Sequence, residues 1–428
     1  MNADLSCRWF AWLALSLLAS AGWAEDWPQW RGPERDGVWR EAGIVEVFPA
    51  EGLQVRWRVA VGPGWATPVI AEGRVIVTDA EMQQPQAWER VRCLEETSGR
   101  ELWSYRYEVT YPEWAFSGEN NNGPTASPVV AEGKVYALGG SGEVLCLAAA
   151  TGELLWRNDL GKEYEVPALQ CRASPLIEGE MLILQLGGKR GACMVALERS
   201  TGRLLWKALE EPVSNSSPIM VVAGGRRQVI VWTGASVTSL DPATGATFWR
   251  EPLTTSGNDD IATPVWVGDR LLISGLMFQL DAEKPGATVR WPESRAVSKR
   301  VLSNTSTPLL AGAAVYSATN LGELICLDAG TGRELWRRSD VTDRKSGASI
   351  HFTPNGETVL LYTERGELLR ARLSPAGYEE LSRTRLLEPH FPFAGRKLVW
   401  AAPAYANRHV FARNERELVC AALGRDER

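Results

Sequence analysis

One repeated unit constrains this chain more than any other feature of its sequence. Each copy opens with Ser/Thr-Pro, continues through short apolar segments joined by a glycine turn, and ends in most copies with a Thr-Gly turn followed by a tryptophan. The openings fall at Pro68, Pro128, Pro175, Pro218, Pro264 and Pro308, and the closing tryptophans are Trp103, Trp156, Trp206, Trp249, Trp291 and Trp336. A spacing of about 43 to 60 residues is typical of arrays built from one supersecondary unit. The sequence therefore predicts one large repeat domain.

Two further units are incomplete, and together they predict how the array closes. A seventh unit runs from Ala348 to Leu381 with a poorly preserved opening. An eighth opens at Pro403 and reaches Leu423 without a closing tryptophan. At the other end of the array, the segment Val55–Val59 contains the closing residue Trp57 but has no opening before it. We therefore expect this segment to supply the last strand of the eighth unit.

The apolar segments of each unit are predicted β-strands. They are about five to seven residues long, are rich in Val, Ile, Leu and Tyr, and are separated by glycine turns that suit tight hairpins. A single four-stranded sheet cannot bury both of its faces, whereas sheets stacked radially cover each face with the next sheet. The sequence thus predicts an all-β, eight-bladed β-propeller of four-stranded antiparallel blades, with its ring closed by an amino-terminal strand.

The amino terminus resembles a cleaved signal peptide. Arg8 precedes the apolar run Trp9–Ala21, and the small residues Gly22 and Ala24 have the spacing of a signal peptidase site. The run is shorter than the roughly 20 apolar residues of a membrane-spanning helix, and no other stretch approaches that length. We predict a periplasmic or secreted protein without an integral membrane segment. The predicted divisions are a signal peptide at 1–24, an amino-terminal strap at 25–54 and a β-propeller at 55–428.

Charge and residue usage argue against several classes of protein. The net charge is -6, and the acidic and basic residues are interspersed, so there is no electrostatic footprint for nucleic acid. The chain has three histidines, His351, His390 and His409, and no Cys-x-x-Cys-His motif, which leaves no covalent haem site and no zinc cluster. We expect a monomer that binds neither nucleic acid nor a metal ion.

The closing segment of the repeat resembles the pyrroloquinoline-quinone (PQQ) repeat family. The pattern Leu-Asp-x-x-Thr-Gly-x-x-x-Trp of that family is present at Leu240–Trp249 and at Leu327–Trp336. The family includes quinoprotein alcohol dehydrogenases and BamB, the propeller subunit of the outer-membrane β-barrel assembly machinery, which has no cofactor. The segment Asp26–Pro33 is similar to the amino terminus of uncharacterised secreted propellers of planctomycete-like bacteria. We expect its tryptophans to pack on the wall of the barrel.

This resemblance implies two alternative functions. The dehydrogenases hold PQQ beside Ca²⁺ and an aspartate base, and they carry two adjacent cysteines against the cofactor, but this chain has no adjacent cysteine pair. Asp260 is a candidate base or metal ligand, with a solvated loop residue as the alternative. We predict a binding or scaffold propeller with no catalytic residues and no cofactor. A quinoprotein dehydrogenase that uses PQQ with Ca²⁺ is the alternative.

The cysteines share one position of the repeat. It holds Cys93, Cys146, Cys326 and Cys420, and in two other units it holds Ala196 and Ser239. A position shared by Cys, Ala and Ser is typical of small buried side chains, so we expect free, buried thiols there. Cys171 and Cys193 depart from the pattern and lie within one unit, which leaves a disulfide between them open.

The residues just before each opening are candidates for a ligand site. They lead into the innermost strand of each blade, so they should surround one mouth of the central channel. The set is Trp65, Asn121, Asn122, Arg172, Asn215, Asn258, Asp260, Asn304 and Trp400. Amides and aromatic rings that converge on a concavity suit a small polar ligand or a protein partner of the cell envelope. The alternative is that asparagine is common before turns because it tolerates unusual backbone angles.

Overall fold

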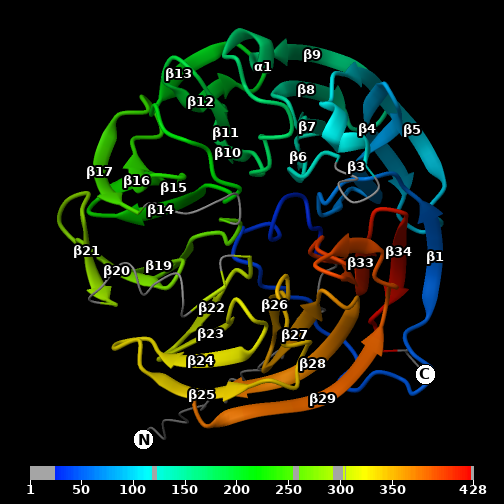
Figure 1. Ribbon diagram of the computed structural model, residues 1–428, viewed down its shortest axis with the longest axis vertical. Helices are drawn as coiled ribbons and strands as arrows, with labels where there is room; N and C mark the ends of the chain where they lie inside the picture. Colours follow the sequence, from blue (N-terminus) through cyan, green and yellow to red (C-terminus); the bar gives the residue numbers. More distant parts are fainter. Residues whose placement is uncertain (1–24, 118–122, 254–259, 293–301, 304, 426–428) are drawn as a thin grey trace, which may run out of the picture.

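Eight four-stranded antiparallel sheets stand around a central channel (Figure 1). The computed structural model describes residues 25–117, 123–253, 260–292, 302–303 and 305–425. The predicted eight-bladed β-propeller is therefore confirmed. The predicted signal peptide lies outside the described residues. No helix in the described part of the chain is long and apolar enough to cross a bilayer.

Blades are numbered here in chain order, and each is given from its innermost to its outermost strand. Blade 1 is β2 (Val69–Ala71), β3 (Arg74–Gln83), β4 (Gln86–Glu95) and β5 (Glu101–Val109). Blade 2 is β6 (Val129–Ala131), β7 (Lys134–Leu138), β8 (Glu143–Ala148) and β9 (Leu154–Asp159). Blade 3 is β10 (Leu176–Glu178), β11 (Met181–Gly188), β12 (Ala192–Glu198) and β13 (Leu204–Ala208). Blade 4 is β14 (Ile219–Ala223), β15 (Arg226–Trp232), β16 (Ser236–Leu240) and β17 (Thr247–Pro252).

The second half of the ring follows the same plan. Blade 5 is β18 (Val265–Val267), β19 (Arg270–Ile273), β20 (Leu276–Leu280) and β21 (Ala287–Trp291). Blade 6 is β22 (Leu309–Ala311), β23 (Ala314–Ala318), β24 (Leu324–Asp328) and β25 (Glu334–Arg338). Blade 7 is β26 (Ile350–Asn355), β27 (Thr358–Thr363), β28 (Glu367–Ser374) and β29 (Gly377–Arg385). Blade 8 is β32 (Ala404–Ala406), β33 (His409–Arg413), β34 (Glu417–Ala422) and β1 (Val55–Ala60).

Three short elements lie in the connections between blades. A hairpin of β30 (Phe391–Phe393) and β31 (Arg396–Leu398) is inserted between blades 7 and 8. One turn of 3-10 helix, η1 (Glu113–Phe116), follows blade 1, and the single-turn helix α1 (Leu160–Glu163) follows blade 2.

Blade 8 is completed by the amino-terminal strand, as predicted. β1 pairs antiparallel with β34, and Trp57 lies opposite Cys420. The same cross-strand position, opposite the closing tryptophan, holds Cys93, Cys146, Ala196, Ser239 and Cys326 in other blades. The position is buried in each of these blades, which explains its preference for small side chains.

Most closing tryptophans join their blade to the next one through the indole N–H group. Six of them donate to a main-chain carbonyl oxygen of the next blade at 2.8–3.0 Å: Trp57 to Glu96, Trp103 to Ala149, Trp156 to Arg199, Trp206 to Pro242, Trp291 to Ala329 and Trp336 to Ser374. Trp249 differs, because its N–H donates to Gln228 Oε1 of its own blade at 3.1 Å. The repeat thus encodes contacts between blades as well as strands within them.

The glycine of the Thr-Gly turn packs directly on the tryptophan of the preceding blade. A Cβ added to Gly152 or Gly202 would lie 2.6 or 2.7 Å from indole carbons of Trp103 or Trp156. Both glycines also have a positive φ of 75°, which side chains rarely adopt. Two separate constraints therefore require glycine at this position.

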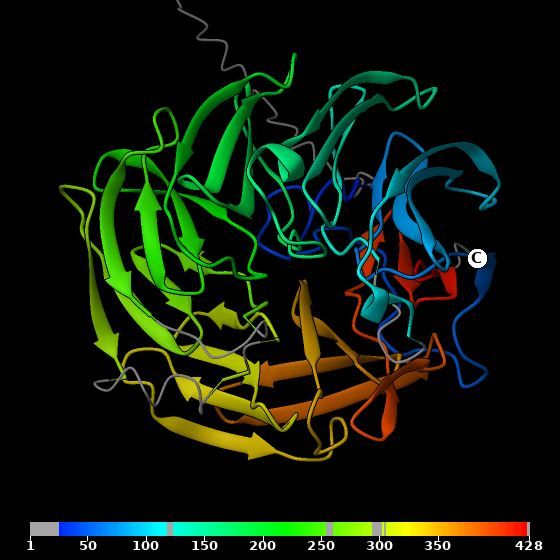
Figure 2. The ribbon, with the colours of Figure 1, turned by 45° about the horizontal axis from the view of Figure 1, so that its top comes forward.

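The amino-terminal strap, residues 25–54, enters the central channel and contacts the inner parts of most blades. Figures 1 and 2 show its first part crossing the middle of the ring. Trp27 exchanges main-chain hydrogen bonds with Ile70 of blade 1, and the Trp39 carbonyl oxygen accepts a hydrogen bond from the side-chain amide of Asn355 in blade 7. The rings of Trp27 and Trp39 lie 5.8 and 5.4 Å from that of Tyr405 in blade 8. The strap therefore joins parts of the ring that are distant in sequence.

Candidate functional site

The central channel contains a cavity of about 460 Å³. Its wall comes from connections that lead into the innermost strands of several blades, and from the loop between β23 and β24. The lining residues are Trp30, Trp65, Thr125, Arg172, Ser174, Asn215, Ser217, Ile261, Ser303, Thr305, Asn320, Ser346, Gly347, Ala348, Ser349, His351, Phe393, Trp400 and Ala402. This volume lies within the range of about 300–1,000 Å³ that is usual for small-molecule sites.

Four of the predicted site residues lie together in this wall. They are Trp65, Arg172, Asn215 and Trp400, which come from the connections that lead into blades 1, 3, 4 and 8. Asp260 is 2% exposed and does not line the cavity; its carbonyl oxygen accepts a hydrogen bond from the Asn215 N–H at 3.0 Å. The other four, Asn121, Asn122, Asn258 and Asn304, lie outside the described residues. Ligand binding by these residues stays a prediction.

Aromatic rings form one side of the cavity. The ring centroids of Trp65 and Trp400 are 5.3 Å apart in an edge-to-face arrangement. Phe391 packs on both, at 5.0 and 5.1 Å, and Phe393 lies 4.9 Å from Trp400. Both phenylalanines belong to the inserted hairpin β30–β31, and of the two only Phe393 is among the described lining residues. The repeat gave no indication of these contacts, because the hairpin lies outside it.

Hydroxyl groups of the Ser/Thr-Pro openings join neighbouring inner strands. Ser127 accepts a hydrogen bond from the Thr67 N–H, Ser174 accepts from the Ser127 N–H, and Ser217 accepts from the Ser174 N–H, at 2.9–3.0 Å. Thr307 likewise accepts from the Thr263 N–H at 3.0 Å. The hydroxyl at the opening therefore has a structural role between adjacent blades, which sequence reasoning did not recognise.

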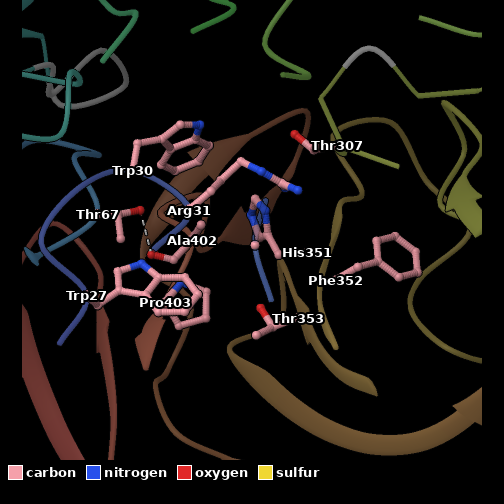
Figure 3. Close-up of a pocket in the computed structure, with 11 residues that line it drawn as sticks. Trp27, Trp30, Arg31, Thr67, Thr307, His351, Phe352, Thr353, Ala402 and Pro403 are labelled. Atoms are coloured by element: carbon pink, nitrogen blue, oxygen red, sulfur yellow. Dashed lines mark hydrogen bonds between the residues drawn. The ribbon is translucent and has the colours of Figure 1, made fainter. Parts of the chain in front are cut away.

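The strap supplies the floor of the cavity. Trp30 from the strap and His351 from β26 line both this cavity and a smaller one of about 30 Å³ that also contacts Arg31. Figure 3 shows the Arg31 side chain extending toward His351, with Trp30 beside it. The Trp30 indole N–H donates to Thr263 Oγ1 at 2.9 Å, which fixes the ring across the channel.

His351 is a neutral side chain at physiological pH. Burial lowers its pKa from the usual 6.5 to about 4; a hydrogen bond to Trp400 opposes that effect, and nearby Arg31 adds to it. Its Nε2 lies 3.3 Å from the Trp400 carbonyl oxygen, so the neutral ring donates there and leaves Nδ1 as an acceptor. A neutral, oriented imidazole of this kind can accept a hydrogen bond from a ligand.

The described cysteines are buried free thiols. Cys171 and Cys193, whose pairing the sequence left open, are not bonded to each other. Burial raises the pKa of the Cys93 and Cys420 thiols to about 12 and that of Cys146 to about 11, so these groups stay protonated and unreactive at neutral pH.

The profile of the protein family described as "Outer membrane protein assembly factor BamB" matches residues 87–338, which is more than half of the chain. The chain belongs to this family. The predicted resemblance to PQQ-type propellers is thereby confirmed at the level of BamB and the quinoprotein dehydrogenases. The similarity to planctomycete-like propellers stays a prediction.

Curated relatives fall into more than one functional class. An outer membrane protein assembly factor BamB from Burkholderia pseudomallei is 26% identical over 236 residues, which cover 53% of this chain and 58% of that protein. The quinoprotein alcohol dehydrogenase PedH from Pseudomonas putida is 26% identical over 157 residues, which cover 33% of this chain and 25% of that protein. The chain thus spans little more than half the length of the first relative and a quarter of the second.

Solved structures show the same fold in both classes. The crystal structure of BamB from Moraxella catarrhalis has a TM-score of 0.60 at 17% identity, covering 86% of this chain and 99% of that chain. Quinohemoprotein alcohol dehydrogenase from Comamonas testosteroni has a TM-score of 0.65 at 15% identity, covering 94% and 81%. At these identities the likeness concerns the fold alone.

Proposed function

We propose that this chain is a binding or scaffold propeller of the cell envelope that holds a small polar ligand, or the end of a protein partner, in its central cavity. The convergence of Trp65, Arg172, Asn215 and Trp400 on one cavity carries the proposal. Aromatic rings supply contact area to a ligand, and amide and guanidinium groups fix its orientation. Membership of the BamB family supports a role in binding other envelope components.

The predicted signal peptide at residues 1–24 and the family support a location in the cell envelope. Relatives described as outer membrane protein assembly factors act, by that description, in the assembly of outer membrane proteins. We propose a periplasmic or secreted location for this chain and, as its partner class, a protein of the same compartment.

A PQQ-dependent dehydrogenase is the second candidate, because PedH and a quinoprotein ethanol dehydrogenase are among the relatives. Such an enzyme needs a Ca²⁺ site, and carboxylates are the usual charged ligands of Ca²⁺. The described residues that line the cavity offer hydroxyls, amides and carbonyl groups but no carboxylate. They therefore fit a quinone with Ca²⁺ poorly, and no reaction step is derived through that cofactor.

Native mass spectrometry tests the binding function. Protein purified from its producing bacterium under non-denaturing conditions should carry a retained small molecule or a partner. An Arg172→Ala variant should lose much of that occupancy while its melting temperature changes little. The control is Arg203→Ala, since Arg203 is 64% exposed at a turn that joins the outer strands of blade 3. Equal occupancy in wild type and Arg172→Ala would remove the cavity as the site.

A dye-linked dehydrogenase assay tests the alternative. We expect no oxidation of alcohols or sugars after the protein is incubated with PQQ and Ca²⁺, because the cavity lining offers Ca²⁺ no described carboxylate. An artificial electron acceptor gives the readout, and a known quinoprotein reconstituted in parallel gives the positive control. Turnover that depends on added PQQ would replace the binding proposal by the enzymatic one.

A further inference from the structure

We infer that the central cavity selects an organic anion, namely a molecule with a flat apolar body and at least one carboxylate, phosphate or sulfonate group. This inference rests on the proposed binding function of the cavity and specifies the chemical class of its ligand. It depends on the charges that line the cavity, on two arginines of the strap close to it, of which Arg35 is buried and Arg31 partly exposed, and on the aromatic wall.

The charged groups among the described residues that line the cavity are cationic. Arg172 lies in its wall, and Arg31 lines the adjoining small cavity, which shares Trp30 and His351 with the larger one. No Asp or Glu is among the described lining residues of either cavity. This contrasts with the whole chain, which carries 52 acidic and 46 basic residues. A concave site lined by one sign of charge concentrates ligands of the opposite sign.

Arg35 is buried in the strap without a carboxylate among its hydrogen-bond partners. Its Nη1 and Nη2 donate to the carbonyl oxygens of Pro175, Ser174 and Pro218 at 2.7–3.2 Å. Burial, together with the smaller effect of neighbouring Arg31, lowers its pKa from 12.5 to about 9, so the group is still protonated at neutral pH. Carbonyl oxygens satisfy the N–H groups but leave the net charge in place.

Arg31 has a similar environment. It donates to the main-chain oxygens of Arg35 and Asp36, at 3.4 and 2.5 Å. Burial lowers its pKa to about 10, and the Asp36 carboxylate partly opposes that effect. That carboxylate forms an ion pair with the exposed side chain of Arg40. Two cations of the strap thus lie close to the cavity, and the neutral ring of His351 adds no further charge.

Buried carboxylates also lie close to the described lining. The main chain of Asp260, which is 2% exposed, contacts Asn215 of the wall. The Glu364 carboxylate accepts a hydrogen bond from the Ser349 N–H at 3.1 Å and forms an ion pair with Arg396, also at 3.1 Å. Neither carboxylate is part of the described lining, whereas Arg172 is, so the charge that the described lining offers a ligand is positive.

The aromatic wall accounts for the flat apolar body of the inferred ligand. Trp65, Trp400 and Phe393 line one side, and Trp30 lines the floor. Indole and phenyl surfaces favour flat apolar bodies and offer little to a strongly hydrated inorganic ion. A ligand that satisfies both halves of the cavity is an amphiphilic organic anion.

A matched pair of fluorescent probes tests this inference. The probe 8-anilinonaphthalene-1-sulfonate and the neutral compound N-phenyl-1-naphthylamine have the same aromatic body and differ in one sulfonate group. Titration of the full-length protein should show one site for the anion, with a dissociation constant at least about tenfold lower than that of the neutral probe, as expected for hydrogen bonds to a charged group. The preference should weaken as salt is added.

Substitutions test where the probes bind and which arginines favour the anionic probe. Arg31→Gln and Arg172→Gln should each reduce the preference for the anionic probe several-fold and leave the neutral probe nearly unaffected. The control is Arg100→Gln, because Arg100 is 64% exposed on an outer turn of blade 1. Ser346→Trp, at an exposed lining position, should reduce the binding of both probes by narrowing the cavity. The melting temperature of each variant shows that it remains folded.

The possible outcomes distinguish a failure of the anion preference from a failure of the proposed binding function. A preference for the anion that is lost in both arginine variants supports the inference. Equal binding of the two probes, with both reduced by Ser346→Trp, overturns the anion class but keeps the cavity as a binding site. Binding that Ser346→Trp does not change, or no binding at all, overturns the proposed function together with the inference.

Discussion

The glycine of the Thr-Gly turn shows how much one residue of the repeat determines. From the sequence alone, a glycine in a turn is explained by its freedom to adopt a positive φ. The structure adds that the indole of the preceding blade occupies the space where a side chain would begin. The sequence could not show this second requirement, because it depends on a contact between two blades.

A comparison of two glycines separates these requirements. Gly202 has φ 75° and packs on Trp156, whereas Gly133 has φ 69° and a Cβ added there would meet no other atom within 4 Å. Gly133→Ala should lower the free energy of unfolding by about 1 kcal/mol through the backbone alone. Gly202→Ala should lower it by about 1–3 kcal/mol more because of the clash. Chemical denaturation measures both, and equal losses would contradict the packing role.

His351 makes the stability of the protein depend on pH. Its pKa is about 4 in the folded protein and 6.5 ordinarily, so the unfolded chain binds this proton more readily. The stability that this histidine contributes is complete above about pH 6.5 and is lost as the pH falls toward 4. Between pH 7 and pH 5, wild type should lose about 2 kcal/mol more unfolding free energy than His351→Gln. Parallel losses in denaturant titrations would show that His351 is not the group responsible.

At the scale of elements, the periodicity of the sequence predicted the strands inside the repeat but not the positions of the segments outside it. The blades and the closing strand β1 follow from the regular order of strands and turns. Four site residues, including Trp65 and Arg172, came together because they share one position of the repeat. Trp30 and Phe393 belong to the strap and to the inserted hairpin, whose positions depend on contacts between distant segments. Their place in the cavity therefore had no signal in the sequence.

The pairing of β1 with β34 predicts the effect of removing it. Deletion of residues 50–60 would leave the edge of β34 exposed and remove Trp57, whose indole N–H donates to Glu96 of blade 1. Unpaired edges associate with other chains, so we expect the deleted protein to aggregate. Size-exclusion chromatography and calorimetry check this. A soluble, monomeric deletion variant with a cooperative melt would refute closure by β1.

At the scale of the whole molecule, the strap and the ring depend on each other. The strap contacts inner strands on opposite sides of the channel and also forms the floor of the cavity. A ligand that rests on Trp30 therefore touches a segment that holds several blades together. Ligand binding should stabilise the entire ring, rather than one blade, by an amount that rises with the logarithm of the ligand concentration divided by its dissociation constant.

The contacts of Trp249 predict where the ring opens first. Its indole N–H remains within blade 4, so it reaches blade 5 through ring packing on Phe278 at 6.1 Å but without the hydrogen bond that the other closing tryptophans make. Local unfolding begins where the fewest interactions must break. In hydrogen-exchange mass spectrometry, the amides of β17 and β18 should exchange faster than those of β13 and β14 at the preceding junction. A propeller that opens at one junction would release its strap and its ligand through that gap, and the order of exchange around the ring would reveal it.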